Sequence, residues 1–388
     1  MKFLTVFVVL VLAALVVGWL LRRGRQAPQA RPAAPPSVPA PRRHAGSSSP
    51  SVPQAPPAPM ADPHSEPPPP PAPVPEALAA FQWVSHSSLS EARQKAIMAA
   101  LQRLPAPSRA LHQLVAPDFL AQASSSDLAE LIQGEPQVAA KVLATVNSPL
   151  FGLQVPVMSI GPAVTYLGLN TVRGICLRYM LEDAFPHSDP QVKRYFAQVW
   201  GASTLASELC QRLAPVGHQA DPGALSTQVL LSFLGRLALA SLLPTPTLLA
   251  LADQDLLSRC QREQAELGLN ASEVGALLMQ SWQLPEALIH STQEIDRLLI
   301  SPPHPPKTKA DQRRALTYLS ARLGERLMWG RATPAQAQAL VMGPEADFHH
   351  LQQHLHGPTL GGVPAWLATA DWQRQIGQMQ QRLQAELP

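Results

Sequence analysis

The distribution of proline most strongly limits what this chain can fold into. Of its 42 prolines, 19 lie within residues 26–75, in a stretch otherwise rich in Ala, Ser, Gln and Arg. With almost no large apolar side chains, such a stretch cannot bury enough surface to offset the entropy lost on ordering. We therefore expect residues 22–75 to form a disordered, proline-rich linker. A folded part of roughly 310 residues should begin near Glu76.

An apolar run precedes the linker. Residues 3–21 contain no charged side chain and are followed by Arg22, Arg23 and Arg25. At about 1.5 Å per residue, a helix of this length nearly spans a hydrocarbon core of roughly 30 Å. A cleaved signal peptide is the alternative, but its apolar region would be shorter and would lead into a small-residue cleavage site. We predict one transmembrane helix over residues 3–21.

The distribution of charge predicts an orientation and argues against one class of partner. Lys2 alone precedes the apolar run, whereas six arginines follow it before residue 44. The positive-inside rule then leaves the N-terminus outside and the C-terminal part in the cytoplasm. The juxtamembrane arginines can also contact anionic lipid headgroups. Because the whole chain carries +3 and residues 1–75 carry +5, residues 76–388 carry −2. This balance gives no support to a nucleic-acid-binding face.

From Glu76 onward, apolar residues recur at helical spacing, and no alternating run is long enough for a convincing strand. The predicted fold class is all-α, a helical bundle. We expect a helical lead-in over residues 76–96, a main domain over residues 97–300 and a C-terminal helical extension over residues 301–388. One continuous helix is expected over about 225–242.

Signatures of catalysis are sparse. The chain has no phosphate-binding Gly-rich loop, no Gly-x-Ser-x-Gly elbow and no His-Glu-x-x-His motif. Cys176, Cys210 and Cys260 are too widely spaced for a disulfide framework or a paired-cysteine zinc site. His350 and His354 stand one helical turn apart, but no third ligand shares their face, so we interpret them as part of a polar surface helix. The sequence predicts no cofactor.

A proline-bracketed loop is the most distinctive local feature. The stretch "KVLATVNSPLFGLQVPVMSIGPAVTYLGLN" (141–170) predicts a helix that ends at Asn147-Ser148 and a rigid loop containing Phe151-Gly152. A new helix should begin at Ser159-Ile160. A rigid connector between two packed helices is the simpler interpretation, and a binding surface is the alternative.

The same residues resemble the signature of the HDOD domain, a helical signalling module of bacteria related to HD-type metal phosphohydrolases. The likeness rests on Glu135-Pro136, Asn147-Ser148, Phe151-Gly152, Ser159-Ile160 and Leu167-Gly168-Leu169, and on the downstream stretches "VWGASTLASELC" and "SEVGALLMQSWQLPEALI". It covers about residues 97–300. The resemblance implies an all-α bundle that is usually non-catalytic and acts in signal-dependent regulation.

The resemblance also implies where a catalytic relative would bind its metal. Such an enzyme holds a divalent ion with histidines and an adjacent His-Asp pair. At the corresponding positions this sequence has Ala202, Ser232-Phe233, Ala271 and Glu294. Alanine and phenylalanine cannot bind a metal ion. The resemblance therefore implies a protein without a metal site and without enzymatic activity.

The resulting hypothesis is a non-enzymatic regulator, tethered to the inner membrane of a bacterium, whose HDOD-like domain binds a protein partner or a signalling nucleotide. One alternative is a residual metal-dependent phosphohydrolase, which would require bound metal. The other is a structural envelope protein whose proline-rich arm crosses the periplasm, which would require the opposite topology.

Overall fold

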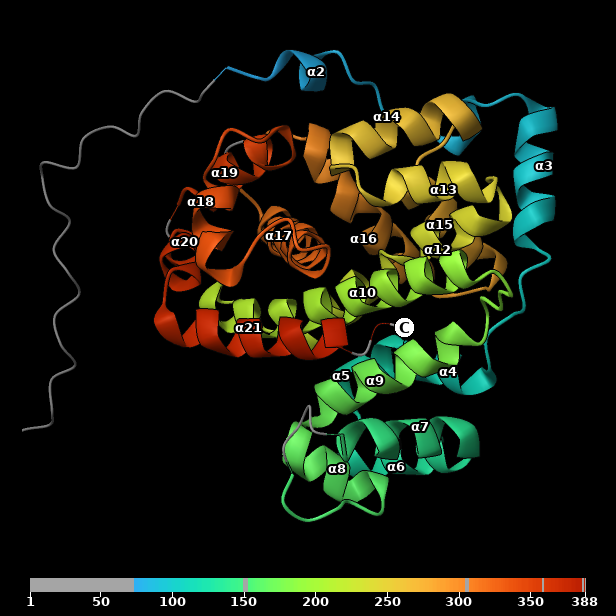
Figure 1. Cartoon of the computed structure of the whole chain (residues 1–388), viewed down its shortest axis with the longest axis vertical. Helices are drawn as coiled ribbons and strands as arrows, with labels where there is room; N and C mark the ends of the chain where they lie inside the picture. Colours follow the sequence, from blue (N-terminus) through green and yellow to red (C-terminus); the bar gives the residue numbers. More distant parts are fainter. Residues whose placement is uncertain (1–72, 149–152, 304–306, 358, 386, 388) are drawn as a thin grey trace, which may run out of the picture. The chain divides into compact units, whose positions relative to one another are not determined.

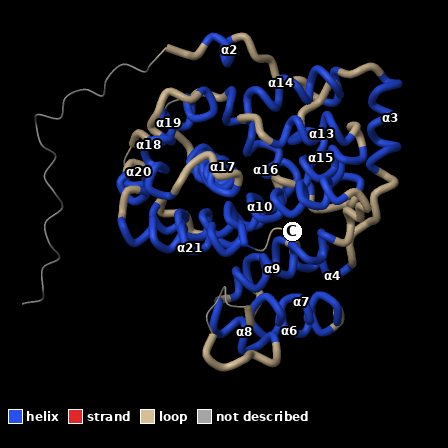
Figure 2. The backbone as a smooth tube through the Cα atoms, in the orientation of Figure 1, coloured by secondary structure: helices blue, strands red, loops and turns tan. Residues whose placement is uncertain are grey.

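The computed structural model describes residues 73–148, 153–303, 307–357, 359–385 and 387. This part of the chain consists of helices and connecting loops and contains no strand (Figure 2), which confirms the predicted all-α class. The apolar run over residues 3–21, nearly all of the linker, Phe151 and Gly152 lie outside the described residues. Within them, only Pro222–Ser241 is long and apolar enough to cross a membrane, and 78% of its apolar window is buried in the protein. Such burial is typical of a core helix.

The lead-in lies against helices that come much later in the chain. It contains α2 (Glu76–Ala79), the 3-10 helix η1 (His86–Ser88) and α3 (Glu91–Leu101). The indole N–H of Trp83 donates to the carboxylate of Glu273, at 2.8 Å. The backbone N–H of Val84 donates to the side chain of Gln264, at 3.1 Å. These bonds attach the lead-in to the body of the protein.

Helices α4 to α9 form the first group of packed elements. They are α4 (Arg109–Leu114), α5 (Pro117–Gln122), α6 (Ser125–Gln133), α7 (Pro136–Val146), α8 (Ile160–Leu167) and α9 (Leu169–Glu182). A capping box between Ser124 and Asp127 starts α6. Pro136 starts α7 at a position that tolerates its missing N–H. Gly168 ends α8 with a φ of 84°, a conformation that favours glycine.

The second group follows. It contains α10 (Pro190–Val216), α11 (Pro222–Leu231), α12 (Leu234–Ala238), η2 (Leu239–Ser241), α13 (Thr245–Ala252), α14 (Leu256–Leu267), α15 (Ala271–Ser281), α16 (Glu286–Arg297) and η3 (Leu298–Ile300). The single helix expected over about 225–242 is wrong, because the chain breaks between α11 and α12 at Ser232 and Phe233. After the break, α12 packs closely against α15.

The C-terminal segment packs on the second group. It contains α17 (Lys309–Met328), η4 (Pro334–Gln336), α18 (Ala337–Val341), η5 (Ala346–Phe348), α19 (His349–Leu355), α20 (Gly362–Leu367) and α21 (Ala370–Ala385). Helix α17 makes its most extensive contact with α10, and α21 lies beside α10 (Figure 1). Close approach of α10 and α17 depends on Gly324, because a Cβ there would lie 2.6 Å from the Cβ of Ala206.

One hydrophobic core contains residues from along the described chain, from Leu78 in α2 to Leu383 in α21. Trp200 and Trp282 are both buried in it. The lead-in and the C-terminal segment therefore contribute to the same core as the helices between them.

Candidate functional site

The loop between α7 and α8 is closed by a side chain at its first residue. Asn147 donates from Nδ2 to the carbonyl oxygen of Val157, at 2.8 Å, and its Oδ1 accepts from the N–H of Val157, at 2.7 Å. One carboxamide thereby satisfies a backbone donor and a backbone acceptor. Ser148 is half-buried beside Asn147, Ser159 is the N-cap position of α8, and Ile160 is buried in the core. The hydrogen bonds of Asn147 and the burial of Ile160 hold the two ends of the loop.

Large apolar side chains are exposed around this loop. Val155 is 71% exposed, Met158 is 84% exposed, and Tyr166 on α8 is 64% exposed. A single exposed apolar residue is ordinary, whereas several in one segment are typical of an interaction surface. The described part of the loop is therefore bonded to Asn147 at Val157 and exposes the apolar side chains of Val155 and Met158.

The positions that would hold a metal in a catalytic relative do not offer a ligand set. Ala202 and Phe233 are fully buried, and Ala271 is buried at the start of α15. The hydroxyl of Ser232 donates to the carbonyl oxygen of Val229, at 2.7 Å. Among the residues that the structure describes, no group of three or more His, Cys, Asp or Glu side chains could hold a metal ion. The residues present therefore do not fit the divalent ion of HD-type enzymes.

Backbone fills the space between two of these positions. Gly235, two residues after Phe233, lies so close to α15 that a Cβ there would be 1.7 Å from the carbonyl oxygen of Ala271. A Cβ on Gly275 would be 3.0 Å from the backbone nitrogen of Gly235. The backbones of α12 and α15 are thus in direct contact at this point.

Beside this contact lies a buried network of arginines and carboxylates. Its arginines are Arg236 on α12, Arg259 on α14 and Arg322 on α17; its carboxylates are Glu263, Asp296 and Glu325. Glu325 accepts hydrogen bonds from all three arginines. Arg236 and Arg259 donate to its Oε1, and Nη1 of Arg322 donates to its Oε2 at 2.6 Å. Every side chain of the network is at most 11% exposed.

The pKa values of two of these carboxylates, Glu325 and Glu263, are shifted in opposite directions. Burial raises the pKa of Glu325, but the fields of Arg259, Arg322 and Arg236 outweigh it and hold this pKa well below its ordinary value. Burial also raises the pKa of Glu263, and Arg259 at 3.6 Å opposes it too weakly, so this pKa lies at about 7. Oε2 of Glu263 accepts the backbone N–H of Ala271, at 2.7 Å. Glu325 is therefore ionised, and Glu263 titrates near neutral pH.

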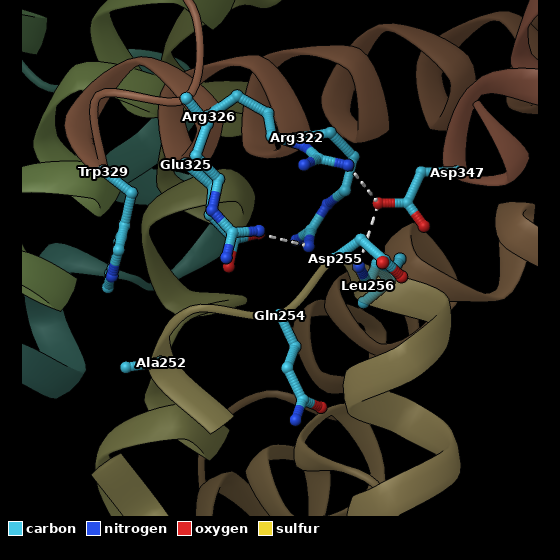
Figure 3. Close-up of a pocket in the computed structure, with 10 residues that line it drawn as sticks. Ala252, Gln254, Asp255, Leu256, Arg322, Glu325, Arg326, Trp329 and Asp347 are labelled. Carbon is cyan, nitrogen blue, oxygen red and sulfur yellow. Dashed lines mark hydrogen bonds and ion pairs between the residues drawn. The ribbon is translucent and has the colours of Figure 1, made fainter. Parts of the chain in front are cut away.

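A small polar cavity adjoins the network (Figure 3). Arg322, Glu325 and Arg326 extend from α17 toward it, and Asp347 faces them from η5. The carboxylate of Asp347 accepts the backbone N–H groups of Leu256 and Leu257, at 2.8 and 3.0 Å. The cavity measures about 10 Å³, room for about one water molecule. This part of the network can hold a water molecule but not a substrate.

The interpretation of His350 and His354 as a polar surface helix is wrong. His350 is 7% exposed and His354 is 3% exposed, because α19 packs against α17 and η3. Burial, together with His349 and His354, lowers the pKa of His350 to about 4, so its side chain is neutral at pH 7. A ring nitrogen of His354 lies 3.2 Å from the carbonyl oxygen of Ser301.

The arginine network was not predicted from the sequence. A local signal existed only for Arg236, which stands alone in the apolar stretch "LLSFLGRLALASLL". A charged residue in such a stretch needs a buried partner. The partner could not be identified from sequence, because Glu325 is 89 residues away.

Comparison with known proteins identifies the family. The HDOD domain model matches residues 104–298, just over half of the chain. No curated protein matches it. The fold is similar to that of an HDOD domain protein of unknown function from Geobacter sulfurreducens, with a TM-score of 0.52 and 17% identity over 76% of this chain and 99% of that chain.

Two further solved structures are similar at lower TM-scores. One is a candidate phosphohydrolase from Shewanella amazonensis SB2B, with a TM-score of 0.49 and 21% identity over 74% of this chain and 98% of that chain. The other is the MmoQ response regulator from Methylococcus capsulatus strain Bath, with a TM-score of 0.36 and 22% identity over 69% of this chain and 98% of that chain. The family match confirms the resemblance seen in the sequence. The chain belongs to the HDOD domain family.

Proposed function

We propose that this chain is a non-catalytic signalling protein, tethered to the inner membrane, whose HDOD domain acts in the cytoplasm by binding a protein partner or a signalling nucleotide. The proposal rests on the residues that stand where an HD-type enzyme has its metal ligands. Where an HD-type enzyme needs imidazole and carboxylate ligands, this chain has Ala202, Phe233 and Ala271, and the backbones of α12 and α15 touch. Glu294 is engaged with Arg314, at 3.0 Å, and with Arg297, at 3.5 Å. Without a metal, no polarised water is available for phosphate ester hydrolysis.

Two features support a binding role at a membrane. The exposed side chains of Val155, Met158 and Tyr166 are apolar surface that a protein partner could cover. The predicted helix over residues 3–21 would anchor the chain, and a flexible linker of about 50 residues would span roughly 40 Å. Tethering raises the effective concentration of the domain near membrane-bound partners.

Metal content and hydrolysis test the non-catalytic part of the proposal. The full chain, purified in detergent without a His tag or chelator, is assayed for divalent metals by elemental analysis and for hydrolysis of a nitrophenyl phosphodiester. We expect substoichiometric metal and a rate equal to that of the matched variant Glu294→Gln. Stoichiometric metal, with hydrolysis that Glu294→Gln or His350→Ala abolishes, would instead establish the residual phosphohydrolase.

Topology is tested separately. Alkaline phosphatase fused after Pro388 is active only outside the cytoplasm, so we expect an inactive fusion in the membrane fraction. An active fusion would favour the structural envelope protein with a periplasmic arm.

A further inference from the structure

A second, larger cavity lies where α11, α16 and α17 meet. Its volume is about 400 Å³, within the range of small-molecule sites. Its lining includes Gln228 from α11, Ala287, His290 and Ser291 from α16, and Ala310 and Arg313 from α17. Two of these helices lie within the segment that the HDOD family model matches, and α17 lies beyond it. The C-terminal segment therefore completes a pocket on the family domain.

One of the two guanidinium groups that line this pocket forms no ion pair within the described residues. Arg314 forms ion pairs with both Glu294 and Asp311, each at 3.0 Å, and these three side chains also line the cavity. The adjacent Arg313 is half-buried, and its guanidinium makes no hydrogen bond or ion pair within the described part of the chain. The two carboxylates and two arginines of the lining balance in charge, and within the described residues Arg313 is the one of these two arginines that no carboxylate holds.

These groups have the chemistry of a phosphate site with room for a polar ring. A guanidinium binds phosphate through two parallel N–H donors. The ring of His290 can add a hydrogen bond to a phosphate oxygen, and the carboxamide of Gln228 offers both a donor and an acceptor to the edge of a base. Ala287 and Ala310 provide small apolar surfaces beside them.

We propose that this pocket binds a phosphorylated nucleoside of mononucleotide size, with Arg313 on its phosphate. The inference rests on the proposed function and deepens it by naming a ligand class and a site. Because α17 forms one wall, a bound nucleotide links the family domain to the C-terminal segment.

Calorimetric titration of the full chain in detergent tests this site with AMP, GMP, adenosine, guanosine and inorganic phosphate as probes. We expect AMP or GMP to bind saturably below about 1 mM, and the corresponding nucleoside at least about tenfold more weakly. Arg313→Gln should weaken nucleotide binding at least about tenfold, which corresponds to about 1.4 kcal/mol. Arg313→Lys should give an intermediate loss, because it keeps the charge without the two parallel donors.

Arg194→Gln is the matched control, because Arg194 is an exposed arginine on α10 outside the pocket. Its nucleotide affinity should stay within about twofold of that of the unchanged chain. Absence of saturable binding up to about 1 mM, or equal affinity in the two arginine-to-glutamine variants, would overturn the site.

Chromatography of the nucleotide after each titration separates the two proposals. Recovery of intact nucleotide, with binding that depends on Arg313, supports both. Hydrolysis of the nucleotide that also depends on Arg313 supports the site but overturns the non-catalytic function. Absence of binding overturns the site alone, since a protein partner could still fulfil the proposed function.

Discussion

At the scale of single residues, Glu325 balances three buried guanidinium groups. Removing one partner of a buried charge network leaves uncompensated charge in a low-dielectric interior, which costs about 3–5 kcal/mol. We expect Glu325→Gln to lower the free energy of unfolding by that amount, measured by urea denaturation of the full chain in detergent. Glu91→Gln, which breaks an exposed pair with Lys95, should have no measurable effect. A loss below about 1 kcal/mol for Glu325→Gln would show that the arginines find other partners.

Glu263 should make stability depend on pH. Its pKa rises from an ordinary 4.5 to about 7 in the folded protein, so the native state binds more protons than the unfolded state between these values. The stability that comes from the protonated side chain is full below about pH 4.5 and is lost as the pH rises through about 7. Glu263→Gln cannot titrate, and its amide oxygen can still accept the N–H of Ala271.

Urea denaturation between about pH 5 and pH 8 measures this effect. The stability of Glu263→Gln relative to the unchanged chain should increase with pH up to about 7, by at most about 1.4 kcal/mol per pH unit, and then level off. A difference that stays constant over this range would mean that Glu263 keeps an ordinary pKa.

Structural features that depend on neighbouring residues could be predicted from the sequence. The helix end at Asn147 and the helix start at Ser159-Ile160 lie where they were expected, because a helix terminus depends on a few neighbouring residues. The helix break at Phe233 was missed, because it accompanies a contact between Gly235 and Ala271 in a later helix. The arginine network was missed for the same reason, since its partners meet only in the folded chain.

At the scale of elements, the loop between α7 and α8 should depend on Asn147. Asn147→Ala removes both hydrogen bonds to the backbone of Val157, each worth about 1 kcal/mol, so the Val157 amide should exchange its hydrogen at least about fivefold faster. Asn147→Asp keeps the acceptor for this amide and should lose less protection. Hydrogen exchange followed by NMR or mass spectrometry checks both variants. Equal exchange in Asn147→Ala and the unchanged chain would show that the loop is held by other contacts.

The packing of α10 on α17 can be tested with two helical glycines. Replacing glycine by alanine inside a helix normally stabilises it by roughly 0.5–1 kcal/mol. Gly174 on α9 has no atom within 4 Å of the added Cβ, so Gly174→Ala should stabilise the protein. In Gly324→Ala the new Cβ would lie 2.6 Å from that of Ala206, so we expect a loss of about 1–3 kcal/mol. Thermal unfolding of both variants gives the sign of each change in stability. Stabilisation by both substitutions would contradict the close packing of α10 on α17.

At the scale of the whole molecule, the family domain and the C-terminal segment should fold together. A chain that ends at Pro303 keeps residues 104–298 but loses Glu325 and the helix that covers α10. We expect it to lose near-ultraviolet circular dichroism and cooperative urea unfolding. A chain that ends at Thr369 loses only α21 and should still unfold cooperatively. Cooperative unfolding of the shorter chain at an unchanged midpoint would show that the domain is independent.

The late position of Glu325 also sets when the protein can fold during synthesis. Glu325 follows Arg236 by 89 residues, so at roughly 5–20 residues per second the ribosome adds it on the order of 4–18 s later. Until then, Arg236 lacks the carboxylate with which it pairs, and burying its charge without that partner is costly. Premature termination before α17 therefore yields chains that cells are expected to degrade and that do not accumulate as partial signalling domains.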